Sequence, residues 1–298
     1  MTTTIALAGK GGTGKTTVAA LLIRYLTEER DGAILAIDAD PASNLDLVLG
    51  VEVEQTVGDI REEMMELVQS SGALAGSMPG GMSKQKYLDY QIQMALEEGD
   101  RVDLLAMGRP EGQGCYCAAN QMLRVILDRI EKQYDYVVID NEAGMEHLSR
   151  RTTRDVDILL LVTDPTQRGL IAAQHMRDMV PELEIGVGHT YLVVNRLRDM
   201  GTGGKELGTG SEKHGAETDR SRPSAHRHRP HPGESTGELP TPLAEAVARS
   251  GLELVGTVPE DLAMAEFEFT GRPLVELPAE TAVYQAVRGI ACKILVDG

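Results

Sequence analysis

The stretch that decides the fold is GKGGTGKTT, residues Gly9–Thr17, near the start of the 298-residue chain. Its glycines fit the G-x-G-x-x-G fingerprint of dinucleotide-binding folds, and residues 9–16 also fit the phosphate loop G-x-x-x-x-G-K-T. Both motifs need a strand before the loop and a helix after it. The dipeptide Lys15-Thr16 decides between them, because a phosphate loop requires it and a dinucleotide fold does not. The sequence therefore predicts a nucleoside triphosphate site.

Each position of this loop has a predicted role. The backbone N–H groups at the start of the following helix cradle the phosphates. Lys15 reaches the β and γ phosphates, and the hydroxyl of Thr16 binds Mg²⁺. We therefore expect ATP and Mg²⁺ as cofactors, with a nucleotide site formed by Gly11, Gly12, Thr13, Gly14, Lys15, Thr16 and Thr17.

Short apolar runs alternate with amphipathic segments along the chain, a pattern typical of a parallel sheet covered by helices on both faces. The runs are Thr4–Ala8, Ala33–Ile37, Val102–Ala106, Tyr136–Ile139, Ile158–Val162, Tyr191–Val194 and Leu254–Val258. The predicted helices are Lys15–Glu29, Val57–Gln69, Ala118–Lys132, Gly169–Met179 and Ala279–Leu295. We predict an α/β P-loop NTPase fold with a mostly parallel central sheet.

Two stretches break this alternation: a Gly/Ser/Pro-rich loop at Ser70–Gly81, and a larger one at about residues 198–242. The larger stretch is rich in Gly, Ser, Thr, Pro, His and charge, and almost free of aliphatic side chains. Such a composition cannot bury enough apolar surface to offset the entropy of ordering. We predict one P-loop ATPase domain over residues 1–298, interrupted at about 198–242 by a disordered insertion.

The overall charge and the cysteine content exclude several classes of protein. A net charge of −17 argues against binding to nucleic acid or to an anionic membrane. Three cysteines are too few for a disulfide framework, and no apolar run approaches the length of a membrane span. The N-terminal residues form a strand and a phosphate loop and are not a signal peptide. We expect a cytoplasmic protein.

The loop contains an additional lysine at its start, Lys10, which makes it similar to the loop of a known class of ATPases. The motif G-K-G-G-x-G-K-T-T resembles the deviant P-loop of the MinD/ParA and nitrogenase-iron-protein ATPases. This resemblance implies a homodimer in which Lys10 reaches across the interface to the partner's phosphates. A cation supplied in this way stabilises charge that develops at the γ phosphate.

Further segments resemble the same class in chain order. AIDADPASNLD, residues 36–46, resembles switch I, in which Asp38 would help to hold Mg²⁺ through water and Asp40 would orient or deprotonate the attacking water. YVVIDNEAG, residues 136–144, resembles the Walker-B strand, with Asp140 at its end and Gly144 in switch II. Taken singly, each carboxylate could instead cap a helix.

Two weaker resemblances concern the base of the nucleotide. YLVVNR, residues 191–196, resembles the strand whose Asn meets adenine, which would be Asn195 followed by Arg196. GTVPED, residues 256–261, resembles a second loop close to the base and contains Pro259. Both segments could equally well be ordinary strand ends followed by loops, with no contact to the nucleotide.

The pair Cys115 and Cys117 points to a metal. In an extended segment residues two apart face the same side, and a helix is predicted to start directly afterwards. A helix N-terminus favours the thiolate, which is the form that binds metal. Two thiolates do not complete a four-coordinate site, but a symmetric dimer supplies four. The alternative is two small apolar residues in a loop.

The segments RPEGQGCYCAAN and IDNEAGMEHLSRRT, residues 109–120 and 139–152, resemble the CooC family. These nickel-inserting ATPases mature carbon monoxide dehydrogenase, and the related AcsF serves acetyl-CoA synthase. The resemblance implies that Cys115 and Cys117 of two protomers bind Ni²⁺ or Zn²⁺ at the dimer interface. It also implies an ATP-hydrolysing metallochaperone with a nickel enzyme as its client. An iron–sulfur carrier or reductase and a MinD/ParA-type positioning ATPase remain alternatives.

Two other features receive a simpler interpretation. The insertion contains His214, His226, His228 and His231, which could hold nickel loosely, although incidental histidines in a loop are the preferred interpretation. Cys292 lies on the apolar face of the last predicted helix, and we expect it to lie in the core.

Overall fold

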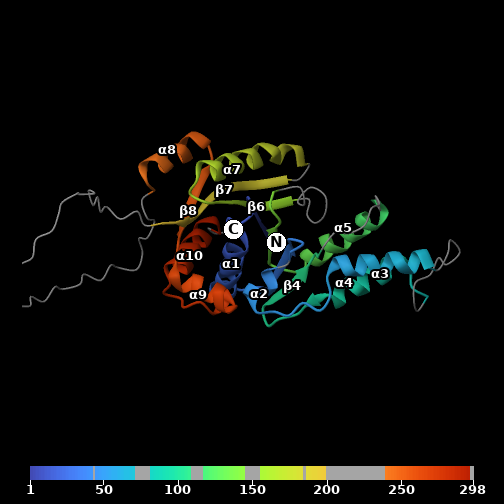
Figure 1. The fold of residues 1–298 in the computed structure, drawn as a ribbon. Coiled ribbons are helices and arrows are strands. Elements are labelled where there is room, and N and C mark those ends of the chain that lie inside the picture. Colours follow the sequence, from blue (N-terminus) through green and yellow to red (C-terminus); the bar gives the residue numbers. More distant parts are fainter. Residues whose placement is uncertain are drawn as a thin grey trace, which may run out of the picture.

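The computed structural model describes residues 1–42, 44–70, 81–108, 117–144, 155–183, 186–198 and 239–295, without the side chains of residues 68–70, 117–122, 124 and 183. Within these ranges the strands form one eight-stranded sheet in the order β3-β4-β2-β5-β1-β6-β7-β8 (Figure 1). The neighbours are parallel except for β3 and β4. The prediction of an α/β fold with a mostly parallel sheet is confirmed.

The described elements have the following bounds. The strands are β1 (Thr3–Ala8), β2 (Ile34–Ala39), β3 (Leu96–Glu97), β4 (Val102–Ala106), β5 (Tyr136–Asn141), β6 (Asp155–Thr163), β7 (Gly186–Leu197) and β8 (Glu253–Pro259). The helices are α1 (Lys15–Glu29), α2 (Leu45–Leu49), α3 (Val57–Ser70), α4 (Lys84–Met94), α5 (Cys117–Glu131), α7 (Gln167–Met179), α8 (Thr241–Ser250), α9 (Leu262–Thr270) and α10 (Ala282–Ile294), with the short 3₁₀ turns η2 (Val180–Leu183) and η3 (Leu274–Glu276).

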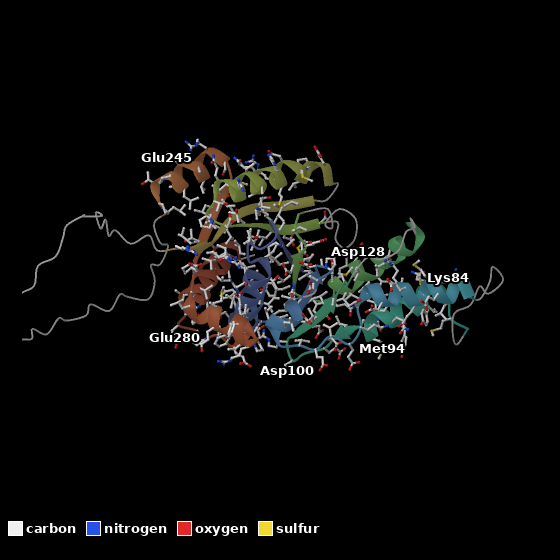
Figure 2. The ribbon with its side chains drawn as sticks, viewed as in Figure 1. Lys84, Met94, Asp100, Asp128, Glu245 and Glu280 are labelled. Carbon is white, nitrogen blue, oxygen red and sulfur yellow. The ribbon has the colours of Figure 1, made fainter. Side chains whose placement is uncertain are left out.

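Two aliphatic layers enclose the sheet. One face packs against α3, α4, α5, α7 and α8, and the other against α1, α2, α9, η3 and α10. Figure 1 shows α7 and α8 along one side of β7 and β8, and α9 and α10 on the other. Because helices cover both faces, central strands such as β2 are buried at every residue. Charged side chains such as Glu245 and Glu280 lie on the outside (Figure 2).

Several predictions about individual segments can be compared with these bounds. The predicted helix Lys15–Glu29 is confirmed by α1, and each predicted apolar run lies within or overlaps a strand. Residues 199–238 of the predicted insertion lie outside the described residues. Its last two residues, Thr241 and Pro242, begin α8. Among the helices that the structure describes, none has both the length and the apolar character needed to cross a membrane.

The prediction that Cys292 lies in the core is wrong. Its side chain is exposed, and its Sγ lies 3.4 Å from the hydroxyl of Tyr25. The buried stripe of α10 consists of Val283, Tyr284, Ala286, Val287, Ile290, Ala291 and Ile294. Cys292 lies one position beyond a member of this stripe, so the helical rotation turns its side chain towards solvent.

Candidate active site

The phosphate loop joins β1 to α1 at the carboxyl edge of the sheet. Gly12 and Gly14 have positive φ angles of 78° and 86°, a region that residues with a side chain rarely adopt. The hydroxyl of Thr13 donates to the carbonyl of Lys10 at 2.9 Å, which closes the turn. The loop ends at Gly14, the N-cap of α1, so unpaired N–H groups of the first helical turn face the loop, as an anion site requires.

A side chain at the end of β7, that of Asn195, holds the phosphate loop in position. The Asn195 side chain, only 2% exposed, donates from Nδ2 to the carbonyl of Thr13 at 2.8 Å. Its Oδ1 accepts from the N–H of Arg196 at 2.8 Å. A Cβ atom on Gly14 would lie 2.2 Å from Nδ2 of Asn195. Asn195 therefore positions the loop, a role that its sequence position did not indicate. Its predicted contact with adenine stays a prediction.

The predicted Walker-B residue lies beside the loop. The hydroxyl of Thr16 donates to Oδ2 of Asp140 at 2.6 Å. Asp140 is 1% exposed and Lys15 is 7% exposed. This arrangement arises because β5 pairs in parallel with β1 and places Asp140 level with Leu7, two residues before the glycine-rich turn. Residues that are more than 120 positions apart in sequence thus share one site.

Switch I is organised by Asp38. Its Oδ1 accepts from the N–H of Asp40 at 3.1 Å, and its Oδ2 accepts from the N–H groups of Asn44 and Leu45 at 3.0 Å each. These bonds fold the chain after β2 into the start of α2. Asp40 is half-buried, and its Oδ1 accepts from the N–H of Ala42 at 2.9 Å. Asp38 is also level with Asp140 in the β2–β5 pair, which brings the predicted carboxylates together.

The electrostatics of these carboxylates fit a divalent cation. Burial raises the pKa of Asp140 to about 7, with a further contribution from the charge of Asp38, while the Thr16 hydroxyl and Lys15 act in the opposite direction. Burial also raises the pKa of Asp38 to about 6. Within the described part of the chain, Oδ1 of Asp140 is buried without a hydrogen-bond partner. Two buried carboxylates beside a hydroxyl, one of them with an oxygen that lacks a hydrogen-bond partner among the described residues, suit Mg²⁺, which prefers oxygen ligands.

The beginning of switch II is tied to the phosphate loop. The N–H of Gly144 donates to the carbonyl of Gly9 at 3.2 Å, and Gly144 has a positive φ of 106°. One residue after Asp140, the Asn141 amide donates to the carbonyl of Leu7 at 2.8 Å. A movement of the phosphate loop would therefore also move the start of switch II, and the reverse. The rest of the stretch, residues 145–152, lies outside the described residues.

The remaining predicted nucleotide residues lie at strand ends on the same edge. Lys10 and Arg196 are exposed, and Arg196 is a non-glycine residue with a positive φ of 56°. Pro259 ends β8 and is level with Leu197 of β7, so Arg196 and Pro259 lie on neighbouring strand ends. Their contact with the base, and the reach of Lys10 to a partner, stay predictions.

The predicted nickel ligands are only partly covered by the structure. Cys115 lies outside the described residues, as do the histidines of the insertion. Cys117 is the first residue of α5, one position before the predicted helix start, and its side chain is not described. Across the described ranges, no three His, Cys, Asp or Glu side chains form a cluster that could hold a metal ion.

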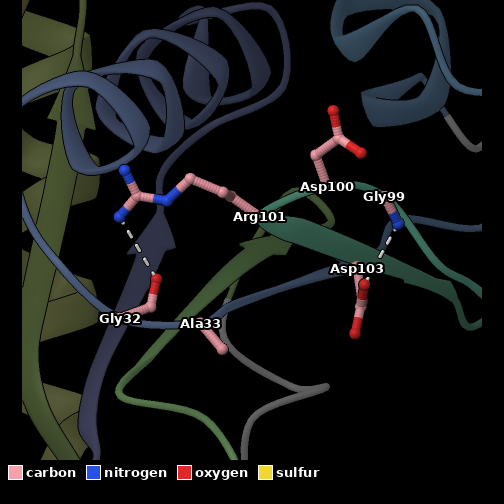
Figure 3. Close-up of a pocket in the computed structure, with 6 residues that line it drawn as sticks. All are labelled: Gly32, Ala33, Gly99, Asp100, Arg101 and Asp103. Carbon is pink, nitrogen blue, oxygen red and sulfur yellow. Dashed lines mark hydrogen bonds between the residues drawn. The ribbon is translucent and has the colours of Figure 1, made fainter.

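A separate cavity of about 320 Å³ lies at the opposite edge of the sheet, at the amino ends of β2 and β4 (Figure 3). Arg101 lines it and donates to the carbonyls of Thr27, Arg30 and Gly32, while Gly99 N–H donates to Asp103. These polar groups already bind one another, so this cavity has a structural role.

Comparison with known proteins agrees with the site geometry. A family model described as an AAA domain matches residues 2–185. The chain belongs to this family. An ATP-binding protein of Methanocaldococcus jannaschii, itself uncharacterized, is 40% identical over 291 residues, which cover 98% of both chains. The carbon monoxide dehydrogenase accessory protein CooC of Rhodospirillum rubrum is 33% identical over 186 residues, covering 61% of this chain and 70% of CooC.

Solved structures with the same fold include the septum site-determining protein MinD of Pyrococcus horikoshii, complexed with Mg-ADP. The two chains share 21% identity with a TM-score of 0.61, over 99% of this chain and 97% of MinD. A ParA family ATPase of Chlorobium tepidum gives a TM-score of 0.61 at 17% identity, over 98% and 99% of the two chains. The fold is thus that of the MinD/ParA P-loop NTPases.

Proposed function

We propose that the chain is an ATP-hydrolysing metallochaperone that acts as a cytoplasmic homodimer and inserts nickel into carbon monoxide dehydrogenase or acetyl-CoA synthase. The observation that carries this proposal is the C-x-C motif of residues 115–117, whose last residue begins α5, in a chain that is 33% identical to CooC over 186 residues. The P-loop by itself is common to the whole class and does not select a cargo.

The nucleotide half of the proposal assigns roles to the residues of the carboxyl edge. Lys15 and the loop amides bind the phosphates, and Thr16 with Asp38 and Asp140 would hold Mg²⁺. When bound, Mg²⁺ supplies positive charge that neutralises the β and γ phosphates. Asp40 orients or deprotonates the attacking water, and its half-buried position leaves it accessible to that water.

The dimer half of the proposal rests on exposed Lys10 and on the two cysteines. In the ATP-bound dimer, Lys10 of each protomer reaches the partner's phosphates and stabilises charge in trans. Cys115 and Cys117 of both protomers then provide four thiolates for one Ni²⁺ or Zn²⁺. Hydrolysis loosens the dimer, weakens this shared site and releases the metal to the client.

The alternative of a MinD/ParA-type positioning ATPase would need a basic DNA-binding face or a basic amphipathic helix. The net charge of −17 argues against the first, and helix α10, the candidate for the second, buries its apolar side against α1 and β8. The other alternative, an iron–sulfur carrier, would use the same cysteines. It predicts absorbance near 400 nm after anaerobic purification, which a nickel carrier free of iron does not.

The experiment that tests the proposal is an anaerobic Ni²⁺ titration of the full chain. The wild type is compared with a Cys115→Ser/Cys117→Ser variant, and a Cys292→Ser variant serves as the matched control because Cys292 is an exposed free cysteine outside the motif. We expect one tight site per dimer, lost in the double variant and kept in the control. Tight binding that survives the double substitution would move the site to the histidines of the insertion. No tight binding in any protein would refute the metallochaperone proposal.

A further inference from the structure

Among the residues that the structure describes, helix α9 carries an apolar stripe that no other element covers. Leu262 and Phe269 are 90% and 91% exposed, higher values than for any other large apolar side chain of the described residues except Met1. They lie seven positions apart and therefore on the same side of the helix, with exposed Ala265 between them. The opposite side of α9 is also apolar, because Met264 and Phe267 are buried in the core. Single exposed apolar residues are ordinary, but an aligned pair on one short helix indicates a docking surface.

This helix is connected to the phosphate loop. Glu268, on the turn next to Phe269, accepts a hydrogen bond from the hydroxyl of Thr17 at 3.3 Å. Thr17 belongs to the GKTT segment that begins α1. At the other end of α9, Asp261 caps the helix by accepting from the N–H of Ala263 at 2.8 Å, two residues after the end of β8. These contacts link α9 to the nucleotide site, so a molecule bound to the stripe could change the position of Thr17.

The border of the stripe is acidic. Glu266 and Glu268 are exposed on the helix, whereas Glu260, which precedes it, is paired with Arg198 at 2.8 Å. The next cation along the chain, Arg272, stacks over Phe267 at 4.0 Å and pairs with Glu276 at 3.5 Å. Anionic membranes are repelled by such a surface, and a second copy of the chain would bring the same acidic border to a two-fold interface.

The segment of residues 199–238 of this chain is poorly suited to cover the apolar stripe of α9. Arg198, the last described residue before this stretch, pairs with Glu260 at 2.8 Å, and residues 199–238 themselves lie outside the described residues. The sequence of that stretch has only Met200 and Leu207 as large apolar residues, too few to cover the two exposed side chains. The required occupant combines apolar residues at helical spacing with flanking positive charge.

We infer that the stripe formed by Leu262, Ala265 and Phe269 docks a basic amphipathic helix of a partner protein, and that occupancy is transmitted to the phosphate loop through Glu268 and Thr17. This is the helix-in-groove mode of recognition, in which apolar anchors give affinity and flanking charges give specificity. The inference concerns the ATPase whatever its cargo, so it does not depend on nickel.

The test uses a fluorescent synthetic peptide of about 18 residues, five helical turns, with Leu on one face and Lys on the other. Binding to the full chain is measured by anisotropy for the wild type and for Leu262→Ser/Phe269→Ser. The matched control is Tyr90→Ser/Met94→Ser, which changes another exposed apolar pair (54% and 61% exposed) on α4, where Figure 2 labels Met94. We expect the α9 variant to bind about 30-fold more weakly and the α4 variant to bind as the wild type does.

Three outcomes would overturn the inference. Equal binding by the two variants, or by a scrambled peptide of the same composition, would make the attraction unspecific. A change in the oligomeric state of the α9 variant alone would assign the stripe to a second copy, and wild-type binding to anionic vesicles would assign it to a membrane. All variants change exposed side chains, and their thermal unfolding should match that of the wild type.

Transmission is tested by ADP affinity at saturating peptide. The peptide should change the ADP affinity of the wild type, and Glu268→Ala should abolish that change while keeping peptide binding. An unaltered peptide effect in Glu268→Ala would refute transmission through Thr17. The Cys115→Ser/Cys117→Ser variant should keep peptide binding, which separates this inference from the proposed nickel function.

Discussion

Alanine substitutions in the phosphate loop separate backbone strain from steric conflict. Gly12 and Gly14 both have positive φ, but a Cβ on Gly12 would meet no atom within 4 Å, whereas one on Gly14 would lie 2.2 Å from Nδ2 of Asn195. Gly12→Ala should therefore lower the free energy of unfolding by strain alone, about 1–2 kcal/mol. Gly14→Ala should cost the same strain plus displacement of the Asn195 amide from the Thr13 carbonyl, about 1–3 kcal/mol more.

The conflict at Gly14 is with a side chain, so a second substitution should relieve it. Asn195→Ala alone loses the bond to Thr13, and the double variant Gly14→Ala/Asn195→Ala loses that bond only once. We therefore expect the double variant to be no less stable than Gly14→Ala, a favourable interaction energy of about 1–3 kcal/mol in the double-mutant cycle. Gly9→Ala gives no such rescue, because its Cβ would lie 2.2 Å from the backbone carbonyl of Val162.

The assay is urea unfolding followed by far-ultraviolet circular dichroism, with binding of a fluorescent ATP analogue as a second readout. We expect Gly14→Ala to lower the affinity for ATP more than Gly12→Ala does, because only Gly14→Ala displaces the Asn195 side chain that holds the loop in place. Equal destabilisation by the two substitutions, or strictly additive effects of Gly14→Ala and Asn195→Ala, would refute the role assigned to Asn195.

Three further predictions follow from other contacts. Asp140→Asn should weaken Mg-ADP binding at least tenfold, as measured by calorimetry, with little change for ADP in EDTA, since Thr16 loses its charged acceptor; unchanged Mg-ADP binding would contradict the site. Partial burial raises the pKa of Glu28, but the Tyr284 hydroxyl and a neighbouring arginine outweigh it and lower this pKa overall. Its stabilising effect is present above the pKa of an unfolded glutamate and is lost as the pH falls through the folded value. Glu28→Gln should therefore be less stable than wild type at pH 7 in urea unfolding, and this deficit should shrink as the pH falls below the pKa of an unfolded glutamate; a constant deficit would show that charge is not the cause. Arg101→Lys should cost about 1–3 kcal/mol of stability because a single ammonium cannot reach three carbonyls, and should leave ADP affinity unchanged; a loss of ADP affinity would contradict the structural role of that cavity.

The sequence predicted the central sheet and α1 well because these elements have simple local signals. Short aliphatic runs bounded by polar residues mark strands buried on both faces, and Gly14 fixes where α1 begins. Helices α2, α4, α8 and α9 were not predicted. In α9 apolar residues point both to the core and to solvent, so the periodicity that marks a surface helix is absent.

The sequence allowed most residues of the candidate site to be predicted, but few of the contacts between them. The phosphate motif and the order of the aspartates indicated that Thr16, Asp38 and Asp140 belong together, and parallel pairing of β1, β2 and β5 brings them to one edge. The hydrogen bond from Asn195 to Thr13 spans 182 positions and depends on where β7 ends, which no local pattern encodes. The exposed position of Cys292 depends on a helical rotation of one residue.

In the proposed mechanism, nucleotide state controls a metal site that two protomers share. The most direct test measures Ni²⁺ affinity anaerobically with no nucleotide, with ADP and with a non-hydrolysable ATP analogue, together with nucleotide affinity with and without Ni²⁺, in the wild type and in Lys10→Ala. We predict tighter Ni²⁺ binding with the ATP analogue than with ADP, the same coupling factor in both directions, and loss of that coupling in Lys10→Ala. Ni²⁺ affinity that is identical in all three nucleotide states would contradict the account.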